Sequence, residues 1–168
     1  MTPPGSASLL LAVFNTAAVG DAERDVARCC ASRSLAAAIA AERPYDDFDA
    51  LDAAIDAGFA RLGWPDTAEA LRGHPRIGDQ DASGWSRTEQ AGAVSAAQDV
   101  ADQIAAGNRA YEERFGHVFL ICATGLTGEQ LLAALRERLG NDPDTERRVA
   151  ADELRKITRL RMRKLLGG

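Results

Sequence analysis

The sequence is poor in histidine, cysteine and aromatic residues. It has two histidines and three cysteines in 168 residues, and aromatic residues make up 5% of the chain. The number of cysteines is odd and their spacing is irregular: they are Cys29, Cys30 and Cys122. No group of Cys and His residues has the spacing of zinc ligands. These absences argue against a disulfide framework and against a metal site, and they predict reduced thiols in an intracellular protein.

The sequence also lacks an excess of basic residues and a long apolar run. Its net charge is -5, with 27% charged residues, which argues against nucleic acid or an anionic membrane surface as the main partner. The start, "MTPPGSASLLLAVFN", has no basic region before its short apolar run, and no segment is long enough for a membrane span. We therefore expect a cytoplasmic protein that acts on a small molecule.

Runs of β-branched residues with a period of two are nearly absent, whereas alanine, leucine and charged residues recur at helical spacing. This pattern predicts an all-α protein. A chain of this length fits one domain, 1–168, folded as a compact bundle of about eight helices. The helices are expected near 8–14, 21–30, 34–42, 47–61, 66–72, 87–114, 128–139 and 143–166.

Several helix ends have recognisable signals. Ser86 and Glu89 form a capping box in "SRTEQ", and Thr127 and Gln130 form another in "TGEQ". Gly116 is typical of a residue that ends a helix. The interval 73–84 is the longest internal stretch without a helical pattern.

That interval begins at "LRGHPRIGDQ", which contains His74 directly before Pro75. Glycine and proline interrupt the helical pattern here, so His74 is expected in a loop. A histidine in a loop can be ordinary surface. However, loops held by a rigid scaffold carry a large share of binding and catalytic residues.

Arg161 shares one stripe of the expected C-terminal helix with apolar residues, whereas three neighbouring arginines are expected to point away. The apolar residues are Ala150, Leu154, Ile157 and Leu165, and the outward arginines are Arg155, Arg159 and Arg163. Arg161 could lay its stem along apolar surface and extend its guanidinium to water. Alternatively, the guanidinium needs an acceptor, which a substrate carbonyl or carboxylate would provide.

Glu89 lies on the apolar face of the expected helix 87–114, together with Val100 and Ile104. Its structural role would be to complete the capping box with Ser86. Its functional role would be to accept hydrogen bonds from a ligand. The sequence leaves both open.

The stretch "RFGHVFLICATG", residues 114–125, is the one strongly apolar run between glycines. The side chains of Val118 to Cys122 are expected to fill the core, and His117 is expected to pack or form hydrogen bonds. If the segment is not helical, its backbone groups need partners elsewhere, and a planar polar ligand could provide them.

Four motifs occur in an order that resembles one enzyme family. They are "HPRIG", "WSRTEQAG", "NRAYEERFGHVFLIC" and "ERLGNDPDTERRVAADELRKITRLRM", and the upstream "FNTA" and "CCAS" fit as well. The chain thus resembles the 2-oxo-4-hydroxy-4-carboxy-5-ureidoimidazoline (OHCU) decarboxylases over nearly its whole length. The resemblance implies an all-helical, cofactor-free, homodimeric enzyme that converts OHCU to (S)-allantoin in urate breakdown.

The resemblance also implies which residues form the site. His74, Glu89 and Arg161 would be catalytic. Substrate would be bound by Pro75, Ser86, Gln90, Phe119, Leu120, Ile121, Cys122 and Ala123. One departure is the stretch "RIGDQDASGW", which is shorter than in many family members.

Two other classes of function are compatible with the residues alone. A non-catalytic helical binding module would make His74 incidental and the alanine-rich faces partner surfaces. A different small-molecule lyase or hydrolase could use the same scaffold. Turnover of OHCU separates these alternatives.

Overall fold

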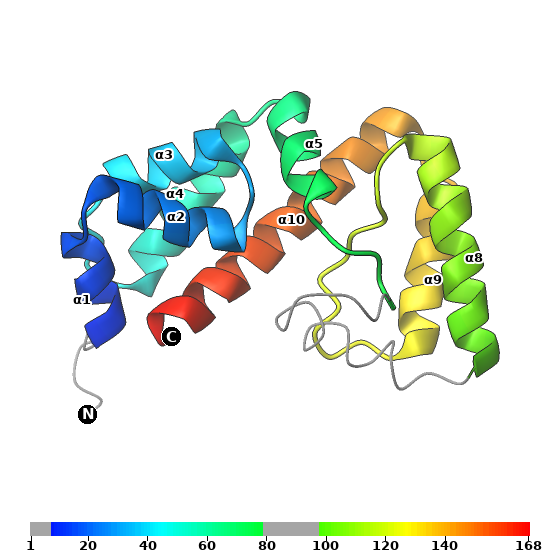
Figure 1. Cartoon of the computed structure of the whole chain (residues 1–168). Coiled ribbons are helices and arrows are strands. Elements are labelled where there is room, and N and C mark those ends of the chain that lie inside the picture. Colours follow the sequence, from blue (N-terminus) through cyan, green and yellow to red (C-terminus); the bar gives the residue numbers. More distant parts are fainter. Residues whose placement is uncertain (1–7, 79–97) are drawn as a thin grey trace. The chain divides into compact units, whose positions relative to one another are not determined.

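The computed structural model describes residues 8–78 and 98–168, and all regular secondary structure in these two ranges is α-helical (Figure 1). The all-α prediction is therefore confirmed. The helices are α1 (Leu9–Thr16), α2 (Val19–Cys29), α3 (Arg33–Ala41), α4 (Phe48–Arg61), α5 (Trp64–Arg72), α8 (Gln98–Phe115), α9 (Gly128–Leu139) and α10 (Pro143–Leu166). Of the helices in the described ranges, none is long and apolar enough to cross a bilayer.

The helix ends follow the signals in the sequence. Thr127 and Gln130 form both halves of the capping box of α9, with N to O distances of 2.9 and 3.2 Å. Gly116 ends α8 with a φ of 76° and donates its N–H to the carbonyl of Glu112 at 2.8 Å. The expected start of the long helix near residue 87 lies outside the described residues.

The chain divides into two compact units. We call Met1–Ala70 with Arg155–Gly168 the N-terminal unit, and Leu71–Leu154 the central unit. The helix α10 is continuous and contributes residues to both units. The expectation of a single domain over 1–168 stays a prediction.

The N-terminal unit buries the apolar faces of α1 to α4 together with the last three turns of α10. Its fully buried side chains include Leu11, Val26, Leu35, Ile55 and Met162. Each comes from a different helix, so the core of this unit depends on the C-terminal end of the chain as well as on the first 60 residues. Burial of apolar side chains is the main stabilising contribution of such a core.

Three arginines of α10 form ion pairs with carboxylates of α4, so another helix covers the face that the sequence predicts to point away from the apolar stripe. Arg155 lies 2.9 Å from Asp56, Arg159 lies 2.9 Å from Asp52, and Arg163 lies 2.6 Å from Asp52. The helical period shows which residues share a face, but it does not show which neighbour covers the opposite face. Here the carboxylates of α4 cover it.

The central unit is built around α8 and α9, which lie side by side (Figure 1). Its core contains Ile77, Ile104, Tyr111, Phe119, Ala123, Leu131, Leu132 and Leu135. The two helices approach closely at Gly107, where an added Cβ would lie 2.5 Å from the Leu135 side chain. The loop that carries His74 and the segment 118–123 both contribute to this core, through Ile77 and through Phe119 and Ala123.

Candidate active site

His74 lies in a non-helical stretch that follows α5, as the glycine and proline around it predict. After Arg72 the chain leaves the helix, and residues 73–78 have no helical assignment. The backbone N–H of His74 donates to the carbonyl of Leu71 at 3.0 Å. His74 and Pro75 are both half-buried. The imidazole is therefore partly shielded from solvent on a loop that starts from a helix end.

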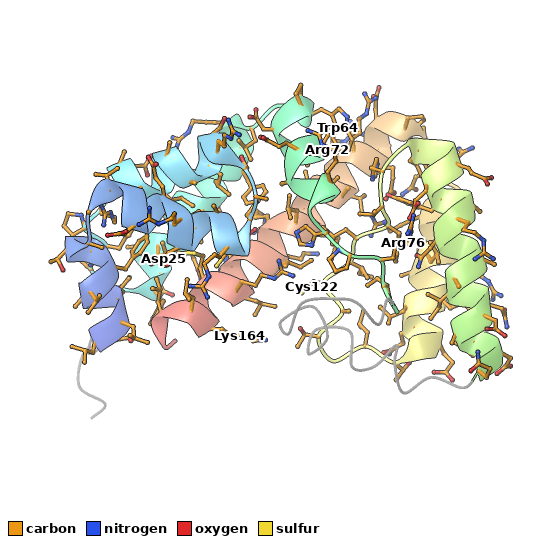
Figure 2. The ribbon with its side chains drawn as sticks, in the orientation of Figure 1. Asp25, Trp64, Arg72, Arg76, Cys122 and Lys164 are labelled. Carbon is orange, nitrogen blue, oxygen red and sulfur yellow. The ribbon has the colours of Figure 1, made fainter. Side chains whose placement is uncertain are left out.

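Two side chains on one face of α8 hold this loop. Glu112 accepts two hydrogen bonds from the Arg76 guanidinium, at 2.6 and 2.8 Å, and Figure 2 labels Arg76. Asn108, four residues earlier, donates its amide to the carbonyl of Ile77 at 3.1 Å. The Arg76 guanidinium lowers the pKa of Glu112, so the carboxylate is ionised at neutral pH. The two residues after Pro75 are thus tied to a rigid helix.

The segment 118–123 is not helical, and charged side chains supply partners for some of its backbone groups. The carbonyl of Leu120 accepts from Nη1 of Arg138 at 2.6 Å, and the N–H of Cys122, labelled in Figure 2, donates to Oε2 of Glu153 at 2.7 Å. Phe119 is 2% exposed and packs in the core. The prediction that its side chain is a core residue is confirmed.

Arg138 belongs to a buried polar network that also includes α8 and α10. Its guanidinium donates to Oε1 of Glu146 at 2.8 and 2.5 Å, and Glu146 is completely buried. The hydroxyl of Tyr111 donates to the same carboxylate, and burial raises the pKa of this phenol. Removal of one partner of a buried ion pair leaves an uncompensated charge and costs about 3 to 5 kcal/mol. This network fixes the guanidinium that holds the Leu120 carbonyl.

His117 is a packing and hydrogen-bonding residue, as predicted. Its ring is half-buried, with its centroid 5.4 Å from that of Tyr111 in an edge arrangement and 6.2 Å from that of Phe115. Its Nδ1 lies 3.1 Å from the carbonyl oxygen of Val118. Burial lowers the pKa of His117. The imidazole is therefore neutral at pH 7.

Arg161 lies in the N-terminal unit and points inward. It is 7% exposed, so its guanidinium does not extend to water. Its Nη1 is 3.5 Å from the carbonyl oxygen of Cys29, at the C-terminal end of α2. Burial also raises the pKa of the Cys29 thiol to about 12 and that of Cys30 to about 11. Both are un-ionised thiols, and the three cysteines are free, as predicted.

The structure places the other expected site residues as follows. His74, Pro75 and the segment Phe119 to Ala123 belong to the central unit, and Arg161 belongs to the N-terminal unit. Ser86, Glu89 and Gln90, with the capping box of Ser86 and Glu89, lie outside the described residues, and their roles stay predictions. Within residues 8–78 and 98–168, no three His, Cys, Asp or Glu side chains come together as metal ligands.

Sequence reasoning missed the residues that hold the site. Asn108, Arg138 and Glu146 each lie on the apolar stripe of their helix, beside Ile104 on α8, Leu135 on α9 and Ala150 on α10 respectively. An inward polar residue on such a stripe was the signal that identified Arg161, and the same signal was present for these three. Glu153 lies at the same helical spacing from Ala150 and Ile157, but its partner is a backbone N–H, which no sequence pattern identifies.

The comparisons with known proteins agree with the sequence motifs. The family model described as OHCU decarboxylase matches residues 15–163. The uric acid degradation bifunctional protein TTL of Arabidopsis thaliana is 36% identical over 82% of this chain and 45% of its own length. The 2-oxo-4-hydroxy-4-carboxy-5-ureidoimidazoline decarboxylase of Amia calva is 34% identical over 79% of each chain.

A solved structure has the same fold. The crystal structure of OHCU decarboxylase in the presence of (S)-allantoin superposes with a TM-score of 0.73 and 34% identity, over 84% of this chain and 96% of that one. The match of the family model covers most of the chain, and the relative from Amia calva exceeds 30% identity over more than two thirds of it. The chain belongs to the OHCU decarboxylase family.

Proposed function

We propose that this protein decarboxylates OHCU to (S)-allantoin with protonation on one face of the product, in the breakdown of urate. Family membership supports this activity, and the relative from Amia calva is named for it. The Arabidopsis relative is named for uric acid degradation, which supports the place in purine breakdown.

The chemistry of OHCU explains why side chains are sufficient. One ring carbon carries both a hydroxyl and the carboxylate, and the neighbouring carbon is part of a C=N bond. When the C–CO2 bond breaks, its electron pair forms a C=C bond and the C=N electrons move to nitrogen, which takes up a proton. The resulting enol then loses its hydroxyl proton and gains a proton on the neighbouring carbon. The enzyme has to orient the carboxylate, stabilise the enol and direct that proton.

Three side chains take the catalytic roles in this proposal. His74 exchanges protons with the substrate, because imidazole does so near neutral pH. Glu89 accepts hydrogen bonds from the ureido or ring N–H groups. Arg161 presents its planar guanidinium to a substrate oxygen. Pro75, Ser86, Gln90 and the backbone from Phe119 to Ala123 provide the remaining contacts.

One observation carries the proposal: a single face of α8 supports two of these elements. Asn108 and Glu112 hold the loop of His74, and Tyr111 on the same face joins the network through which Arg138 holds the segment 118–123. Catalytic and binding groups need such support to keep their geometry. The central unit therefore fixes an acid–base group and a set of backbone groups by means of one helix.

We further propose that the protein works as a homodimer in the cytoplasm, as a single domain and without metal or cofactor. The small number of cysteines and the negative net charge are compatible with a cytoplasmic location. Gel filtration with light scattering measures the oligomeric state of the purified chain directly.

The experiment that tests the function is incubation of the purified protein with freshly generated OHCU, followed by circular dichroism. We expect rapid appearance of the signal of (S)-allantoin, at the same rate with and without EDTA. Activity that is lost with the chelator and restored by a divalent ion would contradict the cofactor-free mechanism. No acceleration over the uncatalysed reaction would favour a binding module, and consumption of OHCU without (S)-allantoin would favour a different lyase or hydrolase.

A further inference from the structure

Two charged side chains bind backbone groups of the segment 118–123 at alternate residues. Arg138 from α9 donates to the carbonyl of Leu120 at 2.6 Å, and Glu153 from α10 accepts from the N–H of Cys122 at 2.7 Å. Hydrogen bonds to ionised groups are stronger than neutral ones and have a defined direction. The segment is therefore held at two points, two residues apart, by groups of opposite charge.

The residues that alternate with Leu120 and Cys122 along the segment have no such partner. The backbone groups of Phe119 and Ile121 form no hydrogen bond within residues 8–78 and 98–168. In extended chain, the N–H and C=O of one residue point to the same edge, and those of the next residue point to the opposite edge. The alternation along Phe119, Leu120, Ile121 and Cys122 is that of an extended chain with one edge occupied and the other available.

Arg138 and Glu153 differ from the arginine and glutamate assigned to the substrate. Arg138 is 6% exposed and its remaining donors are bound to Glu146 and to the hydroxyl of Tyr111, at 2.5 to 2.8 Å and 3.4 Å. Its charge is thus balanced inside the protein. Glu153 uses one carboxylate oxygen for the N–H of Cys122. Both side chains thus bind backbone groups of the segment directly.

From this arrangement, and on the basis of the proposed function, we infer that Arg138 and Glu153 are positioning residues for substrate binding. They fix the edge formed by Leu120 and Cys122, and so present the N–H and C=O groups of Phe119 and Ile121 to the substrate. The ureide groups of OHCU and allantoin carry N–H and C=O groups in alternation. An extended backbone edge is complementary to them, as it is to an added strand.

Turnover of Glu153 variants tests this inference. Glu153→Leu removes the acceptor, and we expect KM for OHCU to rise about tenfold, the equivalent of one charge-assisted hydrogen bond. Inhibition by (S)-allantoin should weaken by a similar factor. The value of kcat should change little, because the backbone contacts are made equally in the ground state and the transition state. Glu153→Gln, whose amide oxygen still accepts from Cys122 but without the charge, should raise KM less than Glu153→Leu does.

A matched control separates positioning from loss of stability. Leu132→Ala removes a buried side chain of the same core but none of the hydrogen bonds to the segment, so it should lower the melting temperature and leave KM unchanged. If Glu153→Leu changes activity only as far as this control does, Glu153 has a structural role and the inference is wrong. An unchanged KM and unchanged inhibition in Glu153→Leu would also overturn it. Wild-type protein that does not turn over OHCU overturns the proposed function itself.

Selective 15N labelling provides a readout that does not depend on turnover. In protein labelled at Phe, Ile and Cys, (S)-allantoin should shift the amide resonances of Phe119 and Ile121 and leave that of Cys122 nearly in place. Glu153→Leu should move the Cys122 resonance without ligand. If the Cys122 amide is the one that responds to (S)-allantoin, the substrate binds the opposite edge and the inference is wrong. Arg138→Lys, which keeps the charge beside Glu146, extends the KM measurement to the Leu120 side.

Discussion

The two histidines of this chain lie in the same unit but in different environments. His74 is on the loop after α5, which is held to α8 through Arg76 and Ile77. His117 packs against aromatic rings, and burial lowers its pKa. A neutral packed imidazole contributes to stability, whereas a half-buried imidazole on an anchored loop can exchange protons with a ligand. Substitution of His74 should therefore lower activity, whereas substitution of His117 should lower stability.

We predict that His74→Asn lowers turnover of OHCU by about 10² to 10⁴, the usual range for a positioned acid–base group, with little change in melting temperature. His117→Asn should cost roughly 1 to 3 kcal/mol of unfolding free energy through lost packing and hydrogen bonding, and the folded protein should stay active. Thermal melts and OHCU turnover of both variants check this. Full activity in His74→Asn would show that the loop has no catalytic role.

The pH dependence of stability provides a second test of the environment of His117. Because the pKa of His117 is lower in the folded protein than its usual value near 6.5, the unfolded chain binds the proton more readily. Wild-type stability should therefore fall as the pH drops below about 6.5. This part of the slope should be missing in His117→Asn. Urea unfolding between neutral and mildly acidic pH measures it.

At the scale of elements, α8 is the support of the central unit. Residues 108, 111 and 112 lie at helical spacing on one face, and they reach the loop of His74 and the Arg138 network. The pair of Arg76 and Glu112 is bidentate, with side-chain exposures of 57% and 23%. An exposed pair of this kind contributes about 1 kcal/mol or less, although good geometry favours the upper end. The main effect of this ion pair is to orient the loop that carries His74.

We predict that Glu112→Gln lowers unfolding free energy by about 1 kcal/mol or less at pH 7 and reduces turnover moderately, because the loop is less firmly held. The pKa of Glu112 is lower in the folded protein, so its contribution is complete above the usual carboxyl pKa and is lost as the pH falls through the lowered value. The difference between variant and wild type should therefore vanish in acid. Urea titrations at several pH values check this, with the exposed Glu113→Gln as the control on the same helix.

Helical periodicity predicted these elements well and their contacts only in part. The start and end of α9 and the start of α10 follow from Thr127, Gly140 and Pro143, because caps and prolines act within one turn of the chain. The inward position of Arg161 was also predicted, although the sequence leaves open whether its guanidinium reaches water. The ion pair between Arg138 and Glu146 was not, since pairing depends on which helices meet. The side chains that bind the backbone groups of Leu120 and Cys122 could not be predicted for the same reason.

At the scale of the whole molecule, the reactivity of the cysteines shows how readily each of the two units opens. Cys29 and Cys30 are 0% and 1% exposed within the N-terminal unit, and Cys122 is half-buried in the central unit. With a pKa near 12, roughly one part in 10⁴ of Cys29 is thiolate at pH 8, and the thiolate is the reactive form. Cys29 and Cys30 can then react only when the N-terminal unit opens. The reactivity of Cys122 depends instead on what surrounds the segment 118–123.

We predict that a thiol reagent at pH 8 modifies Cys122 first, and modifies Cys29 and Cys30 at the rate at which the N-terminal unit opens. Addition of (S)-allantoin should slow the reaction of Cys122, because this residue lies in the segment proposed to bind the substrate. Mass spectrometry of the modified peptides over time gives the three rates, and Cys122→Ser should remove the fast reaction. Denaturant should make all three thiols react together. If Cys29 and Cys30 react as fast as Cys122 in the native protein, the end of α2 beside Arg161 is open to solvent. The Arg161 guanidinium would then not be held in a fixed position for a substrate.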